Sequence, residues 1–210
     1  MQLIGMLDSP YVRRVAIALH ALNIPFDHSP LSVFRNMPEF SQINPLIKAP
    51  TLVCDDGEVL MDSSLILSYI ERIASPDKTL MPADIKRYQR AIRLIGLGIN
   101  ACDKTVQVEY ERKRPEEKQY QPWRDRIQAQ LIAAYDQIEP YAAETSNWLV
   151  LETMTQADIT VCVAWQFTRL IADDVIESNR YPGIAALSKR AEASAAFKAV
   201  PIESEWQPKF

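Results

Sequence analysis

The first eighty residues alternate between short apolar patterns typical of strands and amphipathic patterns typical of helices, and this alternation limits the folds open to the chain. Strand patterns lie at residues 2–6 and 26–28, and on either side of an Asp-Asp-Gly turn at 55–57, where they predict a hairpin. A polar segment at 32–43 is expected to be irregular or a short helix. The order β-α-β-(α)-β-β-α predicts one mixed sheet with helices packed on it.

Two helices of this region have recognisable starts. Ser9 offers a hydroxyl at the N-cap position, and Pro10 suits the first helical position because it has no N–H to leave unpaired. Asp62-Ser63 begins the second helix with another capping side chain. Each helix is expected to bury one apolar stripe. The stripes are Val12, Val15, Ala16 and Leu19 in the first helix, and Ile66, Tyr69, Ile70 and Ile73 in the second.

From about residue 83 the pattern changes to that of long helices. Two stripes with steps of three and four residues predict a pair of antiparallel helices, separated by a charged break at 111–122. A third segment, 157–167, is apolar nearly all round and predicts a central buried helix, with Asp158 in a capping-box-like start. The two stripes are Tyr88, Ile92, Ile95, Ile99, Cys102 and Val106, then Ile127, Leu131, Ala134, Ile138 and Tyr141.

The chain is therefore expected to form two domains, an α/β domain over residues 1–78 and an all-α domain over residues 84–210. Its 210 residues are enough to build a substantial core. The formal net charge of −4 argues against a nucleic-acid-binding protein, for which a basic face is expected.

The sequence also predicts a cytoplasmic protein without a membrane segment. The first ten residues have no basic, apolar leader, and no apolar run is long enough to span a bilayer. Three widely spaced cysteines, Cys54, Cys102 and Cys162, are best interpreted as reduced thiols, with neither a disulfide nor a metal site.

Five stretches occur in the order and spacing of the glutathione S-transferase family. They are "SPYVRRVAIAL", "NPLIKAPTLV", "MDSSLILSYI", "TQADITVCVAW" and, resembling the family's last helices, "YPGIAALSKRAEASAAFKAV". The resemblance covers essentially the whole chain. It implies a cytosolic, serine-type transferase of bacterial kind, with a thioredoxin-like domain at 1–78 that binds glutathione. The helical domain at 84–210 would then form the pocket for the second substrate.

Ser9 is the candidate catalytic residue. The reaction needs glutathione as its thiolate, whereas a free thiol has a pKa of about 8.5, so a hydroxyl donating to sulfur at a helix N-terminus would help. Serine has this role in several classes of the family. The alternative is that Ser9 serves only as a helix cap. Pro10 and Tyr11 follow in the same helix start, and Tyr11 is a second, weaker candidate for contact with the thiol.

The segment Lys48-Ala49-Pro50 is the candidate for binding the tripeptide backbone. From the sequence alone Pro50 is expected to be trans, because cis bonds make up only about 5–6% of X-Pro bonds in folded proteins. The resemblance instead implies a cis bond that exposes the N–H and C=O of Ala49, so that glutathione pairs with them like an added strand. Lys48 either meets the glycyl carboxylate or is an ordinary solvated charge.

Asp62-Ser63 matches the family motif that holds the γ-glutamyl end. The Asp62 carboxylate would meet the ammonium group, while the Ser63 hydroxyl and the helix N-terminus would take the carboxylate. Both residues would also cap their helix. Asp158, by contrast, matches a structural capping motif of the family. The family usually has Gly-Asp shortly before it, and Leu151-Glu152 stands there in this chain, so we expect that turn to be built differently.

The predicted function is a glutathione transferase that conjugates the thiolate to a small hydrophobic electrophile and needs no metal. The resemblance also implies a homodimer. One alternative is a weakly catalytic or non-catalytic module of the same fold that binds ligands or proteins. Another is glutathione-dependent isomerisation or dehalogenation, which shares the glutathione half of the site.

Overall fold

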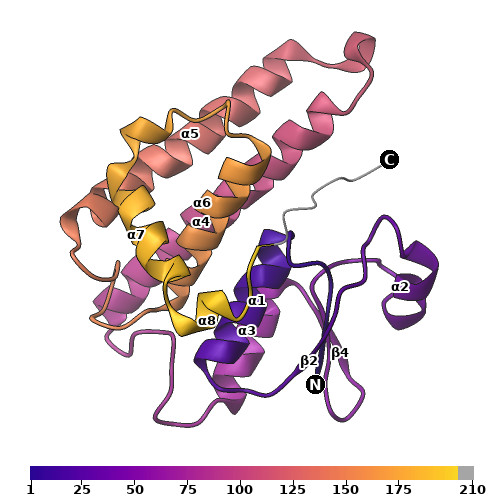
Figure 1. Cartoon of the computed structure of the whole chain (residues 1–210), viewed down its shortest axis with the longest axis vertical. Coiled ribbons are helices and arrows are strands. Elements are labelled where there is room, and N and C mark those ends of the chain that lie inside the picture. The colour runs from indigo at the N-terminus through magenta and orange to yellow at the C-terminus, as the bar shows by residue number, and fades with distance from the viewer. Residues whose placement is uncertain (203–210) are drawn as a thin grey trace. The chain divides into compact units, whose positions relative to one another are not determined.

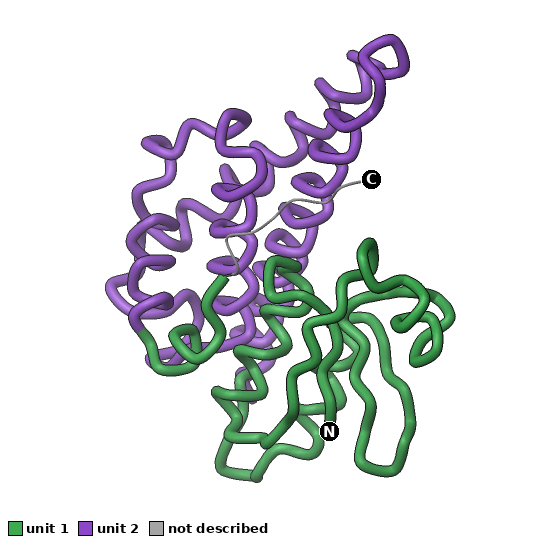
Figure 2. Tube along the Cα trace, turned by 45° about the vertical axis from the view of Figure 1, so that its right-hand side comes forward, with its two compact units in different colours: residues 1–80, 194–210 green, residues 81–193 purple. Residues whose placement is uncertain are grey.

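A computed structural model describes residues 1–202 of the chain, which forms two compact units. One unit comprises residues 1–80 together with the segment that begins at Ser194, and the other comprises residues 81–193 (Figure 2). The last eight residues of the helical domain expected at 84–210 lie outside the described residues.

The first unit contains the predicted mixed sheet, which is confirmed. Its strands are β1 (Gln2–Ile4), β2 (Asp27–Ser29), β3 (Thr51–Val53) and β4 (Val59–Met61), arranged in the order β2-β1-β3-β4. Strand β1 runs parallel to β2 and antiparallel to β3, and β3 and β4 form the expected antiparallel hairpin. Leu3 in β1 pairs with Leu52 in β3, and both are fully buried, so the core of this unit lies against the middle of the sheet.

Helices α1 (Pro10–Ala21) and α3 (Ser63–Ile73) pack on each other, and α1 also contacts the short α8 (Ala195–Lys198) (Figure 1). Helix α2 (Met37–Ile43) forms in the polar segment. The predicted stripe of α1 is confirmed, although the helix is buried on almost every face from Val12 to Leu19. The predicted stripe of α3 is only partly right, because Leu67 is buried and Ile73 is exposed. The buried residues of α3 are Ser63, Ile66, Leu67 and Ile70. Because the first of them is polar, a search for apolar periodicity does not find this face.

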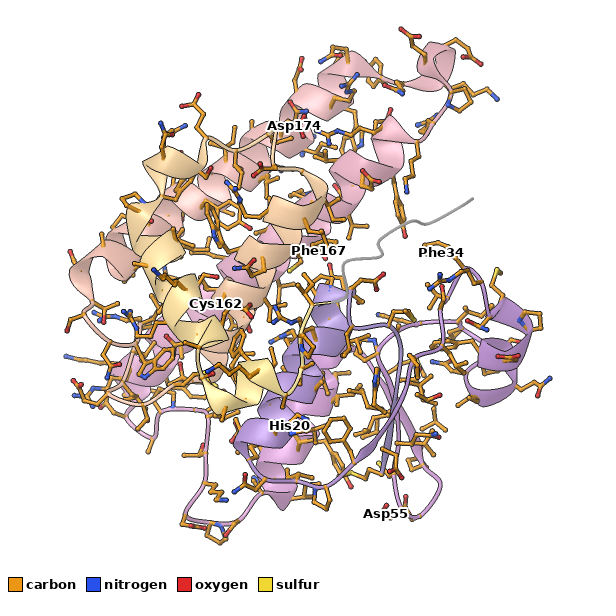
Figure 3. All side chains as sticks on the ribbon, in the orientation of Figure 1. His20, Phe34, Asp55, Cys162, Phe167 and Asp174 are labelled. Carbon is orange, nitrogen blue, oxygen red and sulfur yellow. The ribbon has the colours of Figure 1, made fainter. Side chains whose placement is uncertain are left out.

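The second unit is all helical. It consists of α4 (Ile85–Arg112), α5 (Gln121–Glu144), α6 (Gln156–Ile171) and α7 (Pro182–Glu192), with two short 3-10 turns at Glu116–Lys118 and Ser178–Arg180. Helix α6 packs on α4 and α7, and nearly all its residues are buried, which confirms the predicted central helix. Cys162 and Phe167, labelled in Figure 3, are among its buried residues.

The predicted core stripe of α4 is largely wrong, because only Cys102 of its six residues is buried, while Tyr88 and Ile92 are exposed. The buried face is made mainly of small residues: Ala91, Leu94, Gly98, Ala101, Cys102, Thr105 and Val108. The reason is the close approach of α4 to α6. A Cβ atom on Gly98 would lie 2.9 Å from the Thr160 Cγ2 atom and 3.3 Å from its backbone, so larger side chains are excluded from this seam.

The start of α6 is fixed by the buried Asp158 carboxylate, which confirms its predicted structural role. Oδ1 accepts a bond from the Leu149 N–H at 2.7 Å, and Oδ2 accepts from the N–H and hydroxyl of Thr155 at 2.8 and 2.7 Å. Burial raises the pKa of Asp158 although these bonds act in the opposite direction. The preceding turn is closed by the Asn147 amide, which donates to the Glu152 carbonyl at 2.7 Å.

The three cysteines are buried, and none of them forms a disulfide within residues 1–202. None of the helices in the described part of the chain is both long and apolar enough to cross a membrane.

Replacement of Asp158 by Ala is expected to destabilise the protein by about 2–4 kcal/mol, because it removes the cap and leaves buried donors unpaired. Urea unfolding measures this loss. Asp174→Ala is the control, because its carboxylate is exposed and pairs with Arg112 at the surface, so it should cost less than about 1 kcal/mol. Equal losses in the two variants would contradict the structural role of Asp158.

Candidate functional site

Ser9 lies at the N-cap position of α1. Its backbone is extended, with φ −70° and ψ 121°, and its C=O accepts the first helical bond from the Arg13 N–H at 2.9 Å. Pro10 occupies the first helical turn as predicted. The Ser9 side chain makes no capping hydrogen bond, however, so the hydroxyl does not do what a helix cap usually does. It is half-buried and stands at the positive end of the helix.

Gly5 brings the start of α1 close to the proline segment. This residue has φ +137°, a value that favours glycine, and a Cβ atom built on it would lie 2.6 Å from the Val12 Cγ2 atom and 3.0 Å from the Ala49 Cβ atom. Any larger residue would therefore push α1 and Ala49 away from the end of β1. This role of Gly5 was not predicted, although an isolated glycine at a strand end is a signal of close backbone approach.

The segment from Asn44 to Thr51 is tied at both ends by buried side chains. The Asn44 amide donates to the Thr51 hydroxyl at 2.9 Å, and that hydroxyl donates to the Lys48 carbonyl at 2.8 Å. Asn44 Oδ1 also accepts a bond from the Leu46 N–H at 3.0 Å. These contacts fix the backbone that leads into Pro50. Neither Asn44 nor Thr51 was identified from the sequence as part of the site.

The Ala49–Pro50 peptide bond is cis, as the resemblance implied and contrary to the expectation from the sequence alone. Pro50 is buried and Ala49 is half-buried beside it. The N–H and C=O of Ala49 make no hydrogen bond to another described residue. Both groups therefore remain able to pair with the backbone of a bound peptide.

Asp62 and Lys48 form an ion pair next to this segment. The Asp62 Oδ2 atom lies 3.6 Å from the Lys48 ammonium nitrogen, and both side chains are about half exposed. The other carboxylate oxygen caps α3 by accepting from the Ser64 N–H at 2.9 Å. Asp62 has φ +71°, an uncommon value for a residue with a side chain, and such a conformation often marks a functional position. Asp62 and Lys48, which the sequence analysis assigned to opposite ends of glutathione, thus lie within ion-pair distance of each other.

Ser63 is buried beneath this pair and contacts an arginine that sequence reasoning did not select. Arg14 of α1 donates through Nη1 to the hydroxyl oxygens of Ser63 and Ser64, at 3.2 Å in both cases. The signal in the sequence was two adjacent arginines inside the apolar stripe of α1. Tyr11, the second candidate for contact with the thiol, is half-buried in the first turn of the same helix.

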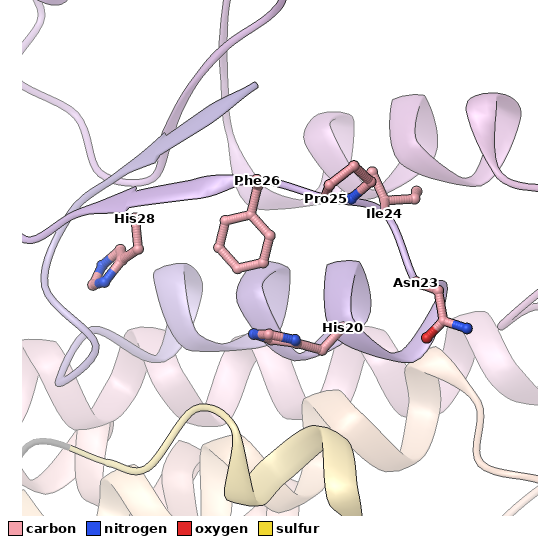
Figure 4. Close-up of a pocket in the computed structure, with 6 residues that line it drawn as sticks. All are labelled: His20, Asn23, Ile24, Pro25, Phe26 and His28. Carbon is pink, nitrogen blue, oxygen red and sulfur yellow. The ribbon is translucent and has the colours of Figure 1, made fainter.

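Figure 4 shows a separate surface pocket lined by His20, Asn23, Ile24, Pro25, Phe26 and His28. The His20 and Phe26 rings meet edge to face at 5.2 Å, and the His28 Nε2 atom lies 2.8 Å from the Gly5 carbonyl oxygen. None of the predicted site residues lines this pocket. Within residues 1–202, no three His, Cys, Asp or Glu side chains gather as a metal site would require.

Comparison with known proteins gives consistent matches. Residues 3–78 match the model of the glutathione S-transferase N-terminal domain. An uncharacterised glutathione S-transferase-like protein of Escherichia coli, YibF, is 27% identical over 78% of this chain and 80% of its own length. A probable maleylacetoacetate isomerase of Drosophila melanogaster is 23% identical over 89% of this chain and 81% of its own length.

A solved structure supports the same relationship over the complete fold. The glutathione S-transferase of Methylobacterium radiotolerans, in complex with glutathione sulfonate, superposes with a TM-score of 0.90 at 28% identity and covers 100% of this chain and 98% of its own. The fold thus defines a protein with a thioredoxin-like N-terminal domain followed by a helical domain. Together with the sequence matches, it supports membership of this chain in the glutathione S-transferase family, whose N-terminal domain model matches residues 3–78.

Replacing Thr51 by Val should remove the hydroxyl that joins Asn44 to the Lys48 carbonyl while keeping the side-chain volume. We expect a loss of about 1–3 kcal/mol in the free energy of unfolding, because buried polar groups are left unpaired. Thr51→Ser retains the hydroxyl and is the control, with a smaller loss. Urea unfolding of both variants checks the expectation, and a valine variant as stable as the serine variant would contradict it.

Proposed function

We propose that this chain binds glutathione on its first unit and that the Ser9 hydroxyl stabilises the thiolate of the bound tripeptide. The observation that carries the proposal is the state of Ser9, whose hydroxyl lies at the N-terminus of α1 without a capping hydrogen bond. A hydroxyl serving only as a cap would accept a bond from the first turn of the helix. The free hydroxyl supports a role toward a ligand.

The remaining contacts of glutathione follow from the same surface. The cysteinyl backbone pairs with the N–H and C=O of Ala49, next to the cis Pro50. The Asp62 carboxylate meets the glutamyl ammonium group, and the Ser63 hydroxyl meets the glutamyl carboxylate. Lys48 lies beside Asp62. We assign it to the glycyl carboxylate of the ligand. Pro10 and Tyr11 shape the start of α1 next to the sulfur.

The chemistry needed from Ser9 is modest. Each unit by which the thiol pKa falls corresponds to about 1.4 kcal/mol, and one hydrogen bond to the sulfur together with the helix N-terminus supplies one or two such units. The thiol proton leaves to solvent. The thiolate sulfur then attacks an electrophilic carbon of a small hydrophobic substrate, forming a C–S bond while the leaving group departs with the bonding electrons.

We assign the second substrate to the all-helical second unit, residues 81–193, and the protein to the cytoplasm. A second candidate reaction is cis–trans isomerisation, which is favoured by the similarity to the Drosophila melanogaster isomerase along 89% of this chain. In that reaction the same thiolate adds to a double bond conjugated to a carbonyl, the carbon–carbon bond rotates, and elimination regenerates glutathione. Both reactions need the same thiolate, so they share the role of Ser9.

Ser9→Ala should lower turnover about 10- to 100-fold in either reaction, because the thiolate loses a hydrogen bond worth one or two pKa units. Retention on immobilised glutathione should persist. The stability should change by less than about 0.5 kcal/mol, since no cap bond is lost. The measurements are turnover with an aryl halide and with a maleyl keto acid, and urea unfolding.

Asp84→Ala is the matched control, because Asp84 caps α4 through a 2.9 Å bond from the Arg87 N–H. This variant should lose about 1 kcal/mol of stability without losing turnover. If Ser9→Ala instead loses stability and keeps its turnover, Ser9 is only a cap. A wild-type chain that is retained on glutathione but turns over neither substrate would favour the non-catalytic binding module.

We also propose that the chain forms a homodimer, supported by an apolar face on α4. Three apolar residues of α4 are exposed: Ile85 at 74%, Tyr88 at 40% and Ile92 at 47%. Their spacing places them on one side of the helix. Such a row of exposed apolar side chains is typical of an interface. A second copy of this chain is the occupant that we infer.

Ile92→Glu should therefore shift the protein from dimer to monomer, because it places a charge in an apolar interface. Sedimentation velocity measures the change, and circular dichroism verifies that the fold is kept. Leu170→Glu, at an apolar residue of α6 that is 38% exposed, is the control and should leave the dimer intact. A monomeric wild-type protein would refute the proposal.

A further inference from the structure

The guanidinium of Arg14 is buried and contacts the first two residues of α3. Arg14 is 2% exposed, and its Nη1 atom lies 3.2 Å from both the Ser63 and the Ser64 hydroxyl oxygen. These serines occupy the first two positions of α3 and directly follow Asp62. Burying a charge costs free energy unless the charge is paired, so a buried guanidinium next to a helix start suggests a functional role.

The direction of these hydrogen bonds decides what the serines can do. A guanidinium group is only a donor, so both hydroxyl oxygens act as acceptors toward Arg14. Each serine O–H is then free to donate to a further acceptor. The Asp62 Oδ1 atom is already engaged with the Ser64 N–H, and the Oδ2 atom faces Lys48. A ligand carboxylate is the acceptor that suits two aligned hydroxyl donors at a helix N-terminus.

The positive charge of Arg14 also favours a carboxylate as the acceptor of the two serine hydroxyls. Arginine stays protonated at any physiological pH, and a charge in the interior is screened far less than one at the surface. Hydroxyls polarised by a cation are better donors, because bonds within one chain polarise one another. Arg14 thereby reaches a bound carboxylate through the two serines without touching it.

We infer that Arg14 is a positioning residue, which orients and polarises the Ser63 and Ser64 hydroxyls toward the α-carboxylate of the glutamyl end of glutathione. The inference rests on the proposed function, since it concerns the same site. It adds Ser64 and the buried cation to that site, and it explains why an amino-acid end is recognised through its carboxylate as well as its ammonium group.

The neighbouring residue provides a matched control. Arg13 is also buried on α1, but its Nε atom donates to the Val200 carbonyl at 3.0 Å and its guanidinium lies 5.4 Å from the centre of the Phe197 ring. These two contacts lie with the segment that begins at Ser194. A variant of Arg13 reports what the loss of any buried arginine from this helix does to stability and binding.

The experiment compares two ligands by calorimetry. One is glutathione, and the other is γ-aminobutyryl-cysteinyl-glycine, which lacks only the glutamyl α-carboxylate. Wild-type protein should bind glutathione about 10- to 100-fold more tightly than the analogue. Arg14→Met should lose most of that preference, with weaker glutathione binding and nearly unchanged binding of the analogue. Arg13→Met should lose stability and keep the preference.

Kinetics give a second readout. In Arg14→Met the KM for glutathione should rise about 10-fold or more, while kcat at saturating glutathione stays within about threefold, because Ser9 is untouched. If the Met variant does not fold, Arg14→Lys takes its place, because it keeps the charge. This variant should retain part of the preference for glutathione over the analogue.

Two outcomes overturn the inference and leave the proposed function intact. One is an equal loss of affinity for both ligands in the Arg14 variants, which would make the residue merely structural. The other is a preference for glutathione that survives both substitutions. A wild-type protein that binds neither ligand would instead overturn the proposed function, and this inference with it.

Discussion

The burial of α1 is the constraint on which the first unit depends. This helix is covered on nearly every face from Val12 to Leu19, and two of the covered residues are arginines. Buried guanidinium groups need acceptors, so the chain must bring oxygen atoms to them. Arg14 takes two serine hydroxyls of α3, and Arg13 takes a carbonyl near the end of the described chain. The same requirement therefore fixes how α3 and α8 pack.

Much of the fold followed from local sequence patterns. The hairpin, the starts of α1 and α3 and the buried α6 were each marked by turn residues, caps or continuous apolar runs. The core face of α4 was not predictable in this way, because periodicity weighs large apolar side chains more heavily than small ones. At Gly98 the deciding factor is the distance between two helices, which depends on the partner residue Thr160.

For the candidate site, the residues proposed to contact the ligand were predicted from the sequence, whereas the residues that support them were not. Ser9 and Asp62-Ser63 stand out as helix starts, whereas the cis geometry of Pro50 came only from the family resemblance. The residues that hold these groups were missed. Gly5, Asn44 and Thr51 act through contacts with segments distant in the chain, and such contacts leave no periodic pattern. Arg14 was visible as a charge in an apolar stripe, but its partners were not.

The bond from Arg13 to Val200 joins residues 187 positions apart in the chain. During synthesis, the first eighty residues leave the ribosome long before the carbonyl that Arg13 requires has been made. The α/β part therefore gains this contact only after the entire helical part has been translated. Nascent chains stalled before α8 would lack the Val200 carbonyl and the Phe197 ring that contact Arg13, and the order of biosynthesis thus couples completion of the first unit to the synthesis of residues 194–200.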